Sequence, residues 1–270
     1  MPSDMSDLTA KFAVCLDRRT LLAAWLLASD AARASSAAQS VLAESDAIRN
    51  PSKPFSVTIN VLEYRNSKLV DSNTLEVFSK LDNVGGQFRT LARFTGPARD
   101  LDKLMLKNGN DMWFFDPASQ ASIRLSPQQR LLGQASNGDV VTINFARDYQ
   151  ADLIGEEELT DGERVLRKCH KLSMDAISPD VVYHKAEMWV EVSSSRPVKA
   201  RFLAESGRLL KTAFYRKYQL QLGRERPTEV VIIDGLDSSW VTVIRYSGFV
   251  YRDVPDSWLQ RDYLPRFKGG

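Results

Sequence analysis

Three consecutive runs in the second half of the chain alternate between apolar and polar side chains. The runs cover residues 181–192, 198–204 and 210–220, and each places most apolar side chains on one parity and charged ones on the other. A period of two puts the apolar side chains on one face of a strand. Arg196-Pro197 and Ser206-Gly207 separate the runs, as turn residues do. The pattern predicts an antiparallel meander with one apolar and one charged face.

Similar β-type segments occupy most of the remaining chain and are separated by turn signals. Further strands are expected at residues 55–61, 69–81, 87–94, 101–108, 111–116, 121–125, 140–145, 163–174, 228–234 and 239–246. Residues 37–49 carry a weak apolar stripe that predicts a helix ending at Asn50-Pro51. About ten strands with this turn spacing are typical of an antiparallel sheet, and a sheet of that size tends to curl around its apolar face. The tail adds residues that we expect to dock on the sheet: Trp258, Leu259, Tyr263, Leu264 and Phe267.

One polar interval, residues 126–139, interrupts the β-type pattern. Ser126 and Pro127 suit a helix start, so residues 130–132 are expected to form about one helical turn. The glycine-containing stretch after them is expected to be flexible. Residues 146–150 are expected to form a second short helix, and residues 156–162 an acidic turn. A long excursion within a β-rich chain is more often functional than an ordinary hairpin loop.

The N-terminus has the pattern of a cleaved signal peptide over residues 1–34. Arg18-Arg19 precedes a short apolar run, and Ala32-Arg33-Ala34 fits a cleavage site. The run is too short to span a membrane, which needs about 20 apolar residues. The arginine pair leaves both the twin-arginine and the general export route open. We therefore expect residues 35–270 to form one exported domain that is soluble and not lipid-anchored.

Composition excludes several classes of function. The net charge of +2 is too balanced to indicate nucleic-acid binding. His170 and His184 are the only histidines, which counts against a histidine-based metal site or catalytic triad. Cys169 is the only cysteine after the predicted cleavage site, so no disulfide can form within the mature chain. It is interpreted as a small core residue on a strand.

An ordered set of short segments resembles the LolA-like outer-membrane lipoprotein-sorting proteins of Gram-negative bacteria. The segments are Ser45-Asp46-Ala47-Ile48-Arg49-Asn50-Pro51, Ala92-Arg93-Phe94-Thr95-Gly96-Pro97, Met112-Trp113-Phe114-Phe115-Asp116-Pro117, Ile123-Arg124-Leu125-Ser126, Gly155-Glu156-Glu157, the strand at 185–192 with Pro197, and Gly207-Arg208-Leu209-Leu210-Lys211. Their order and spacing cover nearly all of residues 37–267. In place of the acidic-aromatic segment that many members carry after a glycine, this chain has residues 133–139.

The resemblance implies a mainly β (α+β) fold: a strongly curved antiparallel sheet that forms an incomplete barrel, with short helices over its open side. It implies a periplasmic carrier that shelters lipid or lipoprotein acyl chains for transfer towards the outer membrane. A monomer that works with an inner-membrane transporter, without cofactor or metal, is expected. The ligand and the direction of transfer are left open.

Large aromatic side chains are the candidates for the cavity lining. They are Phe78, Phe94, Trp113, Phe115, Trp189, Phe202 and Phe214. The alternative for each is ordinary core packing, and the sequence leaves open which parity faces the cavity. In the third run, Phe214 falls on the apolar parity and Lys211 on the charged one. Arg130, Leu131 and Leu132 are candidates for a lid, and Arg49 for a polar latch.

Two other functions are compatible with the same sequence. A periplasmic module that senses lipids or lipoproteins on the same fold is one alternative. An enzyme is the other, because carboxylates cluster at Asp234, Asp237 and Asp253 and at Glu156-Glu157-Glu158. No orienting histidine or metal-ligand spacing accompanies these carboxylates. We therefore expect no catalytic activity.

Overall fold

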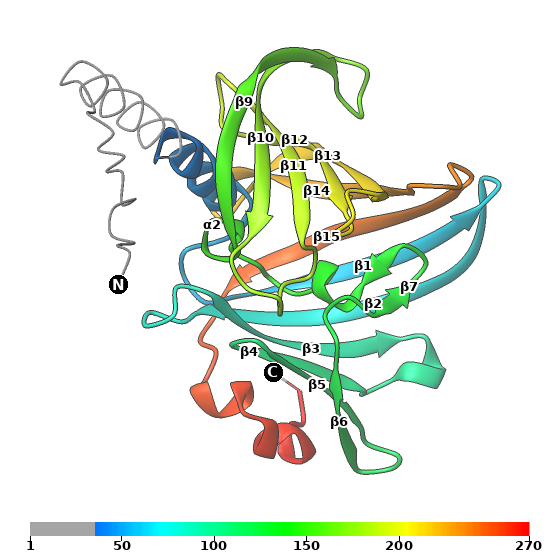
Figure 1. The fold of residues 1–270 in the computed structure, drawn as a ribbon. Coiled ribbons are helices and arrows are strands. Elements are labelled where there is room, and N and C mark those ends of the chain that lie inside the picture. The colour runs from blue at the N-terminus through cyan, green and yellow to red at the C-terminus, as the bar shows by residue number, and fades with distance from the viewer. Residues whose placement is uncertain (1–35, 270) are drawn as a thin grey trace, which may run out of the picture.

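The computed structural model describes residues 36–269, so the predicted signal peptide and its cleavage site lie outside the described residues. The chain forms one large antiparallel sheet of thirteen strands in the order β6-β5-β4-β3-β2-β1-β15-β14-β13-β12-β11-β10-β9 (Figure 1). The two end strands, β6 and β9, do not pair with each other, so the curved sheet stays open. The prediction of an incomplete, mainly β barrel is confirmed.

The strands follow the expected meander along the chain. The N-terminal half contains β1 (Phe55–Arg65), β2 (Lys68–Leu81), β3 (Phe88–Gly96), β4 (Leu104–Asn108), β5 (Asp111–Asp116) and β6 (Ala121–Leu125). The C-terminal half contains β9 (Tyr149–Thr160), β10 (Leu166–Ala176), β11 (Lys185–Glu191), β12 (Pro197–Leu203), β13 (Leu209–Gln221), β14 (Arg224–Asp234) and β15 (Trp240–Tyr251). The pairing of β1 with β15 joins the halves into a single sheet.

Short elements complete the described chain. A helix over residues 36–49 precedes β1, close to the predicted bounds. Two very short strands form a separate hairpin, and a few short helices lie between or after the strands. They are η1 (Ala98–Asp100), β7 (Arg130–Leu132), β8 (Ala135–Ser136), η2 (Asn137–Asp139), α2 (Phe145–Asp148), η3 (Asp256–Leu259) and η4 (Arg261–Arg266).

Several local expectations were wrong. Residues 130–132 form strand β7, not a helical turn, and the strand predicted from residue 181 begins only at Lys185. No strand forms over 140–145, and the residues expected to form an acidic turn mostly belong to β9. The short helix expected at 146–150 is present as α2, one residue earlier and shorter. Consecutive charged residues are tolerated in β9 because an edge strand exposes its side chains, and edge charges oppose pairing with other chains.

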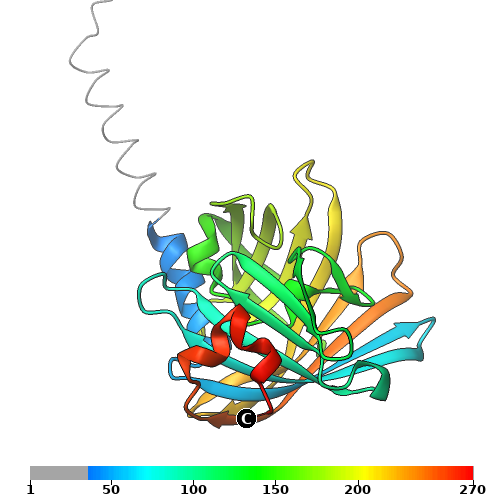
Figure 2. The same ribbon diagram turned by 90° about the horizontal axis from the view of Figure 1, so that it is seen from below.

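The C-terminal tail packs on the convex face of the N-terminal half of the sheet. Figure 2 shows its 3₁₀ helices lying against the strands of that half. Leu259 and Leu264 are buried there against strand residues that include Phe78 and Leu106, and Trp258 stacks edge-on against Phe78 with ring centroids 5.4 Å apart. The expected docking of the tail is confirmed for Trp258, Leu259, Leu264 and Phe267.

The convex face of the C-terminal half instead carries an ion-pair cluster centred on Glu229, beside a small apolar cluster around Trp189. This carboxylate on β14 is buried, and it pairs with Arg216 and Lys217 on β13 and with Arg245 on β15, at 3.1, 2.8 and 2.9 Å. Arg216 and Arg245 lie directly opposite Glu229 in the two neighbouring strands. Burial raises the pKa of Glu229, but the three cations outweigh burial, and the pKa is lowered. The cluster therefore ties three strands together.

A lowered pKa makes this contribution pH-dependent. The unfolded chain takes up the Glu229 proton at a higher pH than the folded chain, so the contribution is present above the unfolded pKa and lost as pH falls through the folded pKa. We expect Glu229→Gln to lower the free energy of unfolding by about 1.5–3 kcal/mol at neutral pH, as when a buried group loses hydrogen bonds to charged partners. Urea unfolding at several pH values measures this: the difference in free energy of unfolding between Glu229→Gln and the unmodified protein should become smaller as the pH falls.

Asp111→Asn is the matched control for Glu229→Gln. Asp111 is half exposed and pairs with the exposed Arg124, and such a surface pair contributes at most about 1 kcal/mol. A Glu229→Gln effect as small as the control, or one that does not change with pH, would contradict the assignment.

Candidate functional site

The concave face of the sheet is covered by residues 126–145, which we call the plug. The plug includes β7, β8 and η2 and crosses the open side of the curved sheet (Figure 1). Its apolar side chains share one core with side chains of the sheet. The buried plug members of this core are Ala135, Val140, Val141, Ile143 and Phe145. The plug therefore fills the hollow that the sheet would otherwise leave open.

A glycine lets the plug approach the sheet closely. Gly133 has a φ of +56°, a left-handed conformation that favours glycine. A Cβ at this position would lie 2.3 Å from the Thr242 hydroxyl oxygen on β15. The backbone N–H of Gln134 donates to that same hydroxyl at 2.7 Å. A larger residue at 133 would push the plug away from the sheet.

A buried polar network fixes the middle of the plug to β13. The Lys211 ammonium donates to the backbone carbonyl of Gln134 at 2.9 Å and forms an ion pair with the Asp139 carboxylate. The Tyr183 hydroxyl donates to Asp139 at 2.8 Å, and the Ser136 backbone N–H donates to it at 2.7 Å. The Lys211 side chain is only 5% exposed. Both charges are therefore held by each other and by hydrogen bonds in place of water.

Burial is the largest cause of the pKa shifts of Lys211 and Tyr183 in this network. Loss of hydration lowers the pKa of Lys211, and the charge of Asp139 partly restores it. Burial together with the negative charge of Asp139 raises the pKa of Tyr183 well above its usual value. Tyr183 therefore stays a neutral hydrogen-bond donor at ordinary pH.

The end of the N-terminal helix holds the C-terminal end of the plug. Arg49 and Asn50 donate to the backbone carbonyl of Ile143 at 3.2 and 2.8 Å. Asp46 pairs with Arg49 and accepts a hydrogen bond from the Ala146 N–H at 2.7 Å. The predicted latch residue Arg49 thus contacts the plug, although whether it acts as a latch stays a prediction.

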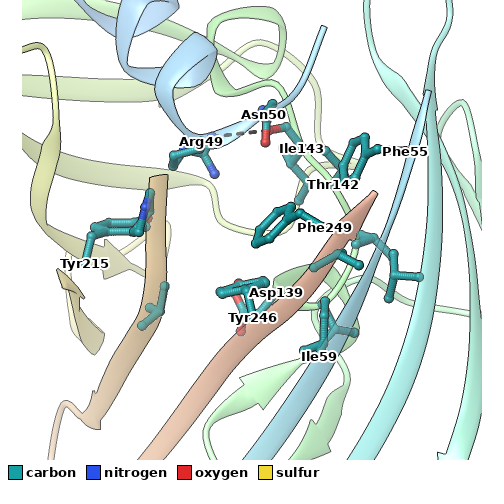
Figure 3. Close-up of a pocket in the computed structure, with 16 residues that line it drawn as sticks. Arg49, Asn50, Phe55, Ile59, Asp139, Thr142, Ile143, Tyr215, Tyr246 and Phe249 are labelled. Atoms are coloured by element: carbon teal, nitrogen blue, oxygen red, sulfur yellow. Dashed lines mark hydrogen bonds between the residues drawn. The ribbon is translucent and has the colours of Figure 1, made fainter. Parts of the chain in front are cut away.

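Two adjoining cavities of about 90 and 60 Å³ lie between the sheet, the plug and the end of the helix. Figure 3 shows the residues that line the first of them. We call them together the inner cavity. Their shared walls include Tyr215 on β13, Val230 on β14 and Tyr246 on β15. Further apolar wall residues come from the strands β1, β2, β12, β13, β14 and β15: Phe55, Val57, Ile59, Val77, Phe202, Ala213, Ile232, Ile244 and Phe249.

The walls of the inner cavity combine apolar side chains with polar groups that are paired or neutral. Its two charged wall residues in the described chain, Arg49 and Asp139, are each paired, with Asp46 and Lys211. Burial raises the pKa of Tyr215 to about 12, and burial likewise raises the pKa of Tyr246, so both phenols stay neutral. Such walls suit an apolar ligand better than a charged one.

The inner cavity is too small for a long acyl chain while the plug is in place. A cavity of about 150 Å³ in a protein core holds one benzene molecule, and both parts of the inner cavity are smaller. A chain of many methylenes would have to occupy the space now filled by Val140, Val141 and Ile143 of the plug. The arrangement is therefore a closed container whose filling requires the plug to move.

Two of the seven aromatic residues predicted to line a cavity lie on the concave side. Phe202 lines the inner cavity, and its ring centroid is 4.3 Å from that of Tyr183. Phe94 belongs to the same core and packs edge-on against Phe114, although it lines neither part of the inner cavity. Ligand contact by Phe202 remains a prediction.

The other five aromatic residues lie on the convex side, contrary to expectation. Phe78, Trp113 and Phe115 pack under the C-terminal tail. Trp189 packs with Cys169, and Phe214 lies beside Lys199, whose ammonium is 5.8 Å from its ring. The reason is parity: the neighbours Met188 and Ala213 face the concave core, so Trp189 and Phe214 must point the other way.

The three predicted lid residues all belong to the β7 strand of the plug. Leu131 and Leu132 are partly buried against the main core. Arg130 is exposed, and its guanidinium lies over the Trp240 ring, 4.3 Å from the centroid. The expected lid segment is therefore part of the cover, although it forms a strand and not a helix.

The sequence reasoning missed the residues that hold the plug. Lys211 was assigned to the wet face of β13, whereas it points into the concave side, directly across from Phe202. Val181, Val182 and Tyr183 were assigned to a strand, whereas they form a buried loop against the plug. Burial of Cys169 in strand β10 is confirmed.

The described part of the chain has neither a membrane-spanning helix nor a cluster of metal-binding side chains. No helix among residues 36–269 is long and apolar enough to cross a membrane. Within the same residues, no group of three or more His, Cys, Asp and Glu side chains is placed to bind a metal ion.

The fold and its covered hollow define a class of protein that known structures also represent. A LolA superfamily protein from Nitrosomonas europaea is 36% identical, with a TM-score of 0.75 over 84% of this chain and 98% of its own. A DUF1329 family protein from Desulfovibrio piger shares 20% identity and a TM-score of 0.72 over 86% of this chain and 99% of its own. A "putative outer membrane lipoprotein-sorting protein domain" from Vibrio parahaemolyticus shares 16% identity and a TM-score of 0.72 over 86% and 100%.

The chain belongs to the LolA superfamily, as its resemblance predicted. A family model described only as "uncharacterized protein" matches residues 86–266. No curated protein matches the chain.

The buried network makes a direct prediction for stability. Lys211→Met and Asp139→Asn should each lower the free energy of unfolding by about 3–5 kcal/mol, because each leaves a buried polar partner unpaired. The double variant should lose much less than the sum, since neither unpaired charge remains. Urea unfolding of the four proteins measures this coupling.

Arg124→Met is the control for this cycle, because Arg124 pairs with Asp111 at the exposed surface. We expect a change of at most about 1 kcal/mol for it. Additive losses in the Lys211 and Asp139 variants would show that the pair does not hold the plug.

Proposed function

We propose that the protein is a periplasmic carrier that shelters the acyl chain of a lipid or lipoprotein between the sheet and the plug. The observation that carries this proposal is the inner cavity, whose strand walls are largely apolar, under a segment that polar contacts hold at its middle and at its C-terminal end. Such a segment can leave as a unit while the antiparallel sheet keeps its own backbone hydrogen bonds. The space it vacates is bounded by apolar strand residues.

The energetics favour an acyl chain as the occupant. Burial of a chain contributes about 0.8 kcal/mol per methylene. The open concave face would otherwise expose side chains such as Val57, Ile59 and Val230 to water, which costs free energy. An acyl chain therefore replaces the apolar contacts that the sheet loses when the plug leaves. The net free energy of binding is then small, so the carrier can both take up and release its cargo.

Location and partners are part of the same proposal. The predicted signal peptide supports export, and one structure of the same fold is described as an outer membrane lipoprotein-sorting protein domain. A carrier of this kind receives its cargo from a membrane and delivers it to another apolar acceptor. We propose an inner-membrane transporter as donor and the outer membrane as the destination. No catalytic step is required.

The direct test is to identify what the protein carries. Mature protein purified from the periplasm without detergent should yield acyl-containing lipid in mass spectrometry of an organic extract. The delipidated protein should bind a fluorescent fatty acid saturably with one site per chain. Absence of lipid in the extract together with no saturable binding would overturn the proposal.

Filling the inner cavity should block this binding. Ala213 lies on the concave side of β13, is 2% exposed and lines the inner cavity. We expect Ala213→Trp to weaken fatty-acid binding at least about tenfold, because the indole takes the volume of several methylenes. A fluorescence titration measures the affinity, and urea unfolding shows whether the variant is folded.

Phe214→Trp is the matched control, since Phe214 is the next residue on the same strand but points to the convex side. It should leave the affinity unchanged. Should Ala213→Trp fail to fold, the smaller change Val230→Phe serves, as Val230 also lines the inner cavity. Equal binding by the cavity variant and the control would contradict a ligand in this cavity.

A further inference from the structure

A second, larger pocket of about 520 Å³ lies at the end of the half-barrel where the N-terminal helix stops. We call it the outer pocket. Its walls come from the end of that helix, the β2–β3 turn, α2, the β13–β14 turn and the end of β15. These segments are distant in sequence and meet only at this end of the sheet.

Three arginines line the outer pocket: Arg147, Arg224 and Arg226. Among residues 36–269, none of the three forms an ion pair with a carboxylate. The one carboxylate in the pocket wall, Asp46, is already paired with Arg49. The pocket therefore carries positive charge that the described chain does not neutralise.

Arg226 shows the consequence of this arrangement. It is 2% exposed and donates to the backbone carbonyls of Ala47 and Ile48 at the end of the helix, at 3.3 and 2.7 Å. Burial, together with the nearby charge of Arg224, lowers the pKa of Arg226. An anion in the pocket would offset both effects, and guanidinium groups bind phosphate oxygens with paired N–H donors.

The outer pocket also has an apolar wall, formed in part by Leu81, Phe88 and Leu222. A site with arginines on one side and apolar side chains on the other fits a molecule that has an anionic group at one end and a hydrophobic chain at the other. A free inorganic anion would use only the arginines.

One layer of contacts separates the outer pocket from the inner cavity. Asn50 lines both, and it donates to the plug carbonyl of Ile143 at 2.8 Å. Asp46 and Ala146, which share a hydrogen bond, face the outer pocket, whereas Arg49 faces the inner cavity. Movement of the plug breaks these contacts and joins the two spaces.

We propose that the outer pocket binds the phosphate of a phospholipid headgroup whose acyl chain enters the inner cavity past Asn50. This inference rests on the proposed carrier function and names its cargo as an anionic phospholipid. Arg147 and Arg224 are the exposed cations that contact the phosphate. Arg226 holds the end of the N-terminal helix and adds positive charge to the buried wall of the outer pocket.

The test compares two lipids with the same acyl chains. Delipidated protein is incubated with vesicles of neutral galactolipid, without phosphatidylcholine, that contain either phosphatidylglycerol or diacylglycerol. The protein is then reisolated, and the lipid bound to it is quantified by mass spectrometry. We expect phosphatidylglycerol to be preferred at least about tenfold, and the preference to fall as salt screens the arginines. Arg147→Gln/Arg224→Gln should abolish the preference and leave diacylglycerol uptake unchanged.

Lys68→Gln/Arg164→Gln is the matched control, because it removes the same charge from two exposed positions elsewhere, the start of β2 and the β9–β10 turn. It should keep the preference for phosphatidylglycerol. Equal uptake of both lipids by the unmodified protein, or an unchanged preference in the arginine variant, overturns the headgroup site while leaving the carrier function intact. Uptake of neither lipid overturns the carrier function itself.

Inorganic phosphate and glycerol phosphate separate a headgroup site from a site for a free anion. Both are titrated into the delipidated protein by calorimetry. Weak binding that the arginine variant loses, together with a preference for phosphatidylglycerol, supports the proposal. Tight binding of free phosphate without any preference between the two lipids would overturn it.

Discussion

The structure depends on covering the concave face of an open antiparallel sheet. Strands β1, β2, β12, β13, β14 and β15 turn apolar side chains inwards, and exposure of this face to water would cost much of the free energy that folding gains. The chain covers the face with its own residues 126–145 and not with a second sheet. Because the main part of this cover is one segment, which packs beside the N-terminal helix and the 181–183 loop, the same constraint that stabilises the fold also provides a compartment that can be opened.

The anchors are polar, and this choice has physical consequences. Apolar residues in place of Lys211 and Asp139 would often stabilise a protein as well or better. A buried ion pair, by contrast, requires one defined position of the plug, since any shift leaves a charge unpaired. At the C-terminal end of the plug, Asn50 and Arg49 converge on the Ile143 carbonyl. The plug is therefore held in one register at two places, and between them Thr142 adds a hydrogen bond to Ser79 on β2.

The sequence predicted the architecture well and the site only in part. Alternation and turn signals gave the meander, the helix before it and the docking tail, because these depend on local patterns. The sequence could not predict which face of the sheet Trp189 and Phe214 occupy. The Lys199 ammonium lies over both rings, so these aromatic side chains are also stable on the convex face. Lys211 was misplaced because its partner Asp139 is 72 residues away, and no local pattern reports such a pairing.

The two halves of the sheet differ in how they are supported, and this difference bears on movement. The N-terminal half is packed on its convex side by the tail around Leu259 and Leu264, so bending it would disrupt an apolar layer. The C-terminal half carries on that side mainly ion pairs around Glu229, which adjust to small shifts without opening a void. A bulkier guest would therefore deform β10–β14 more easily than β2–β5.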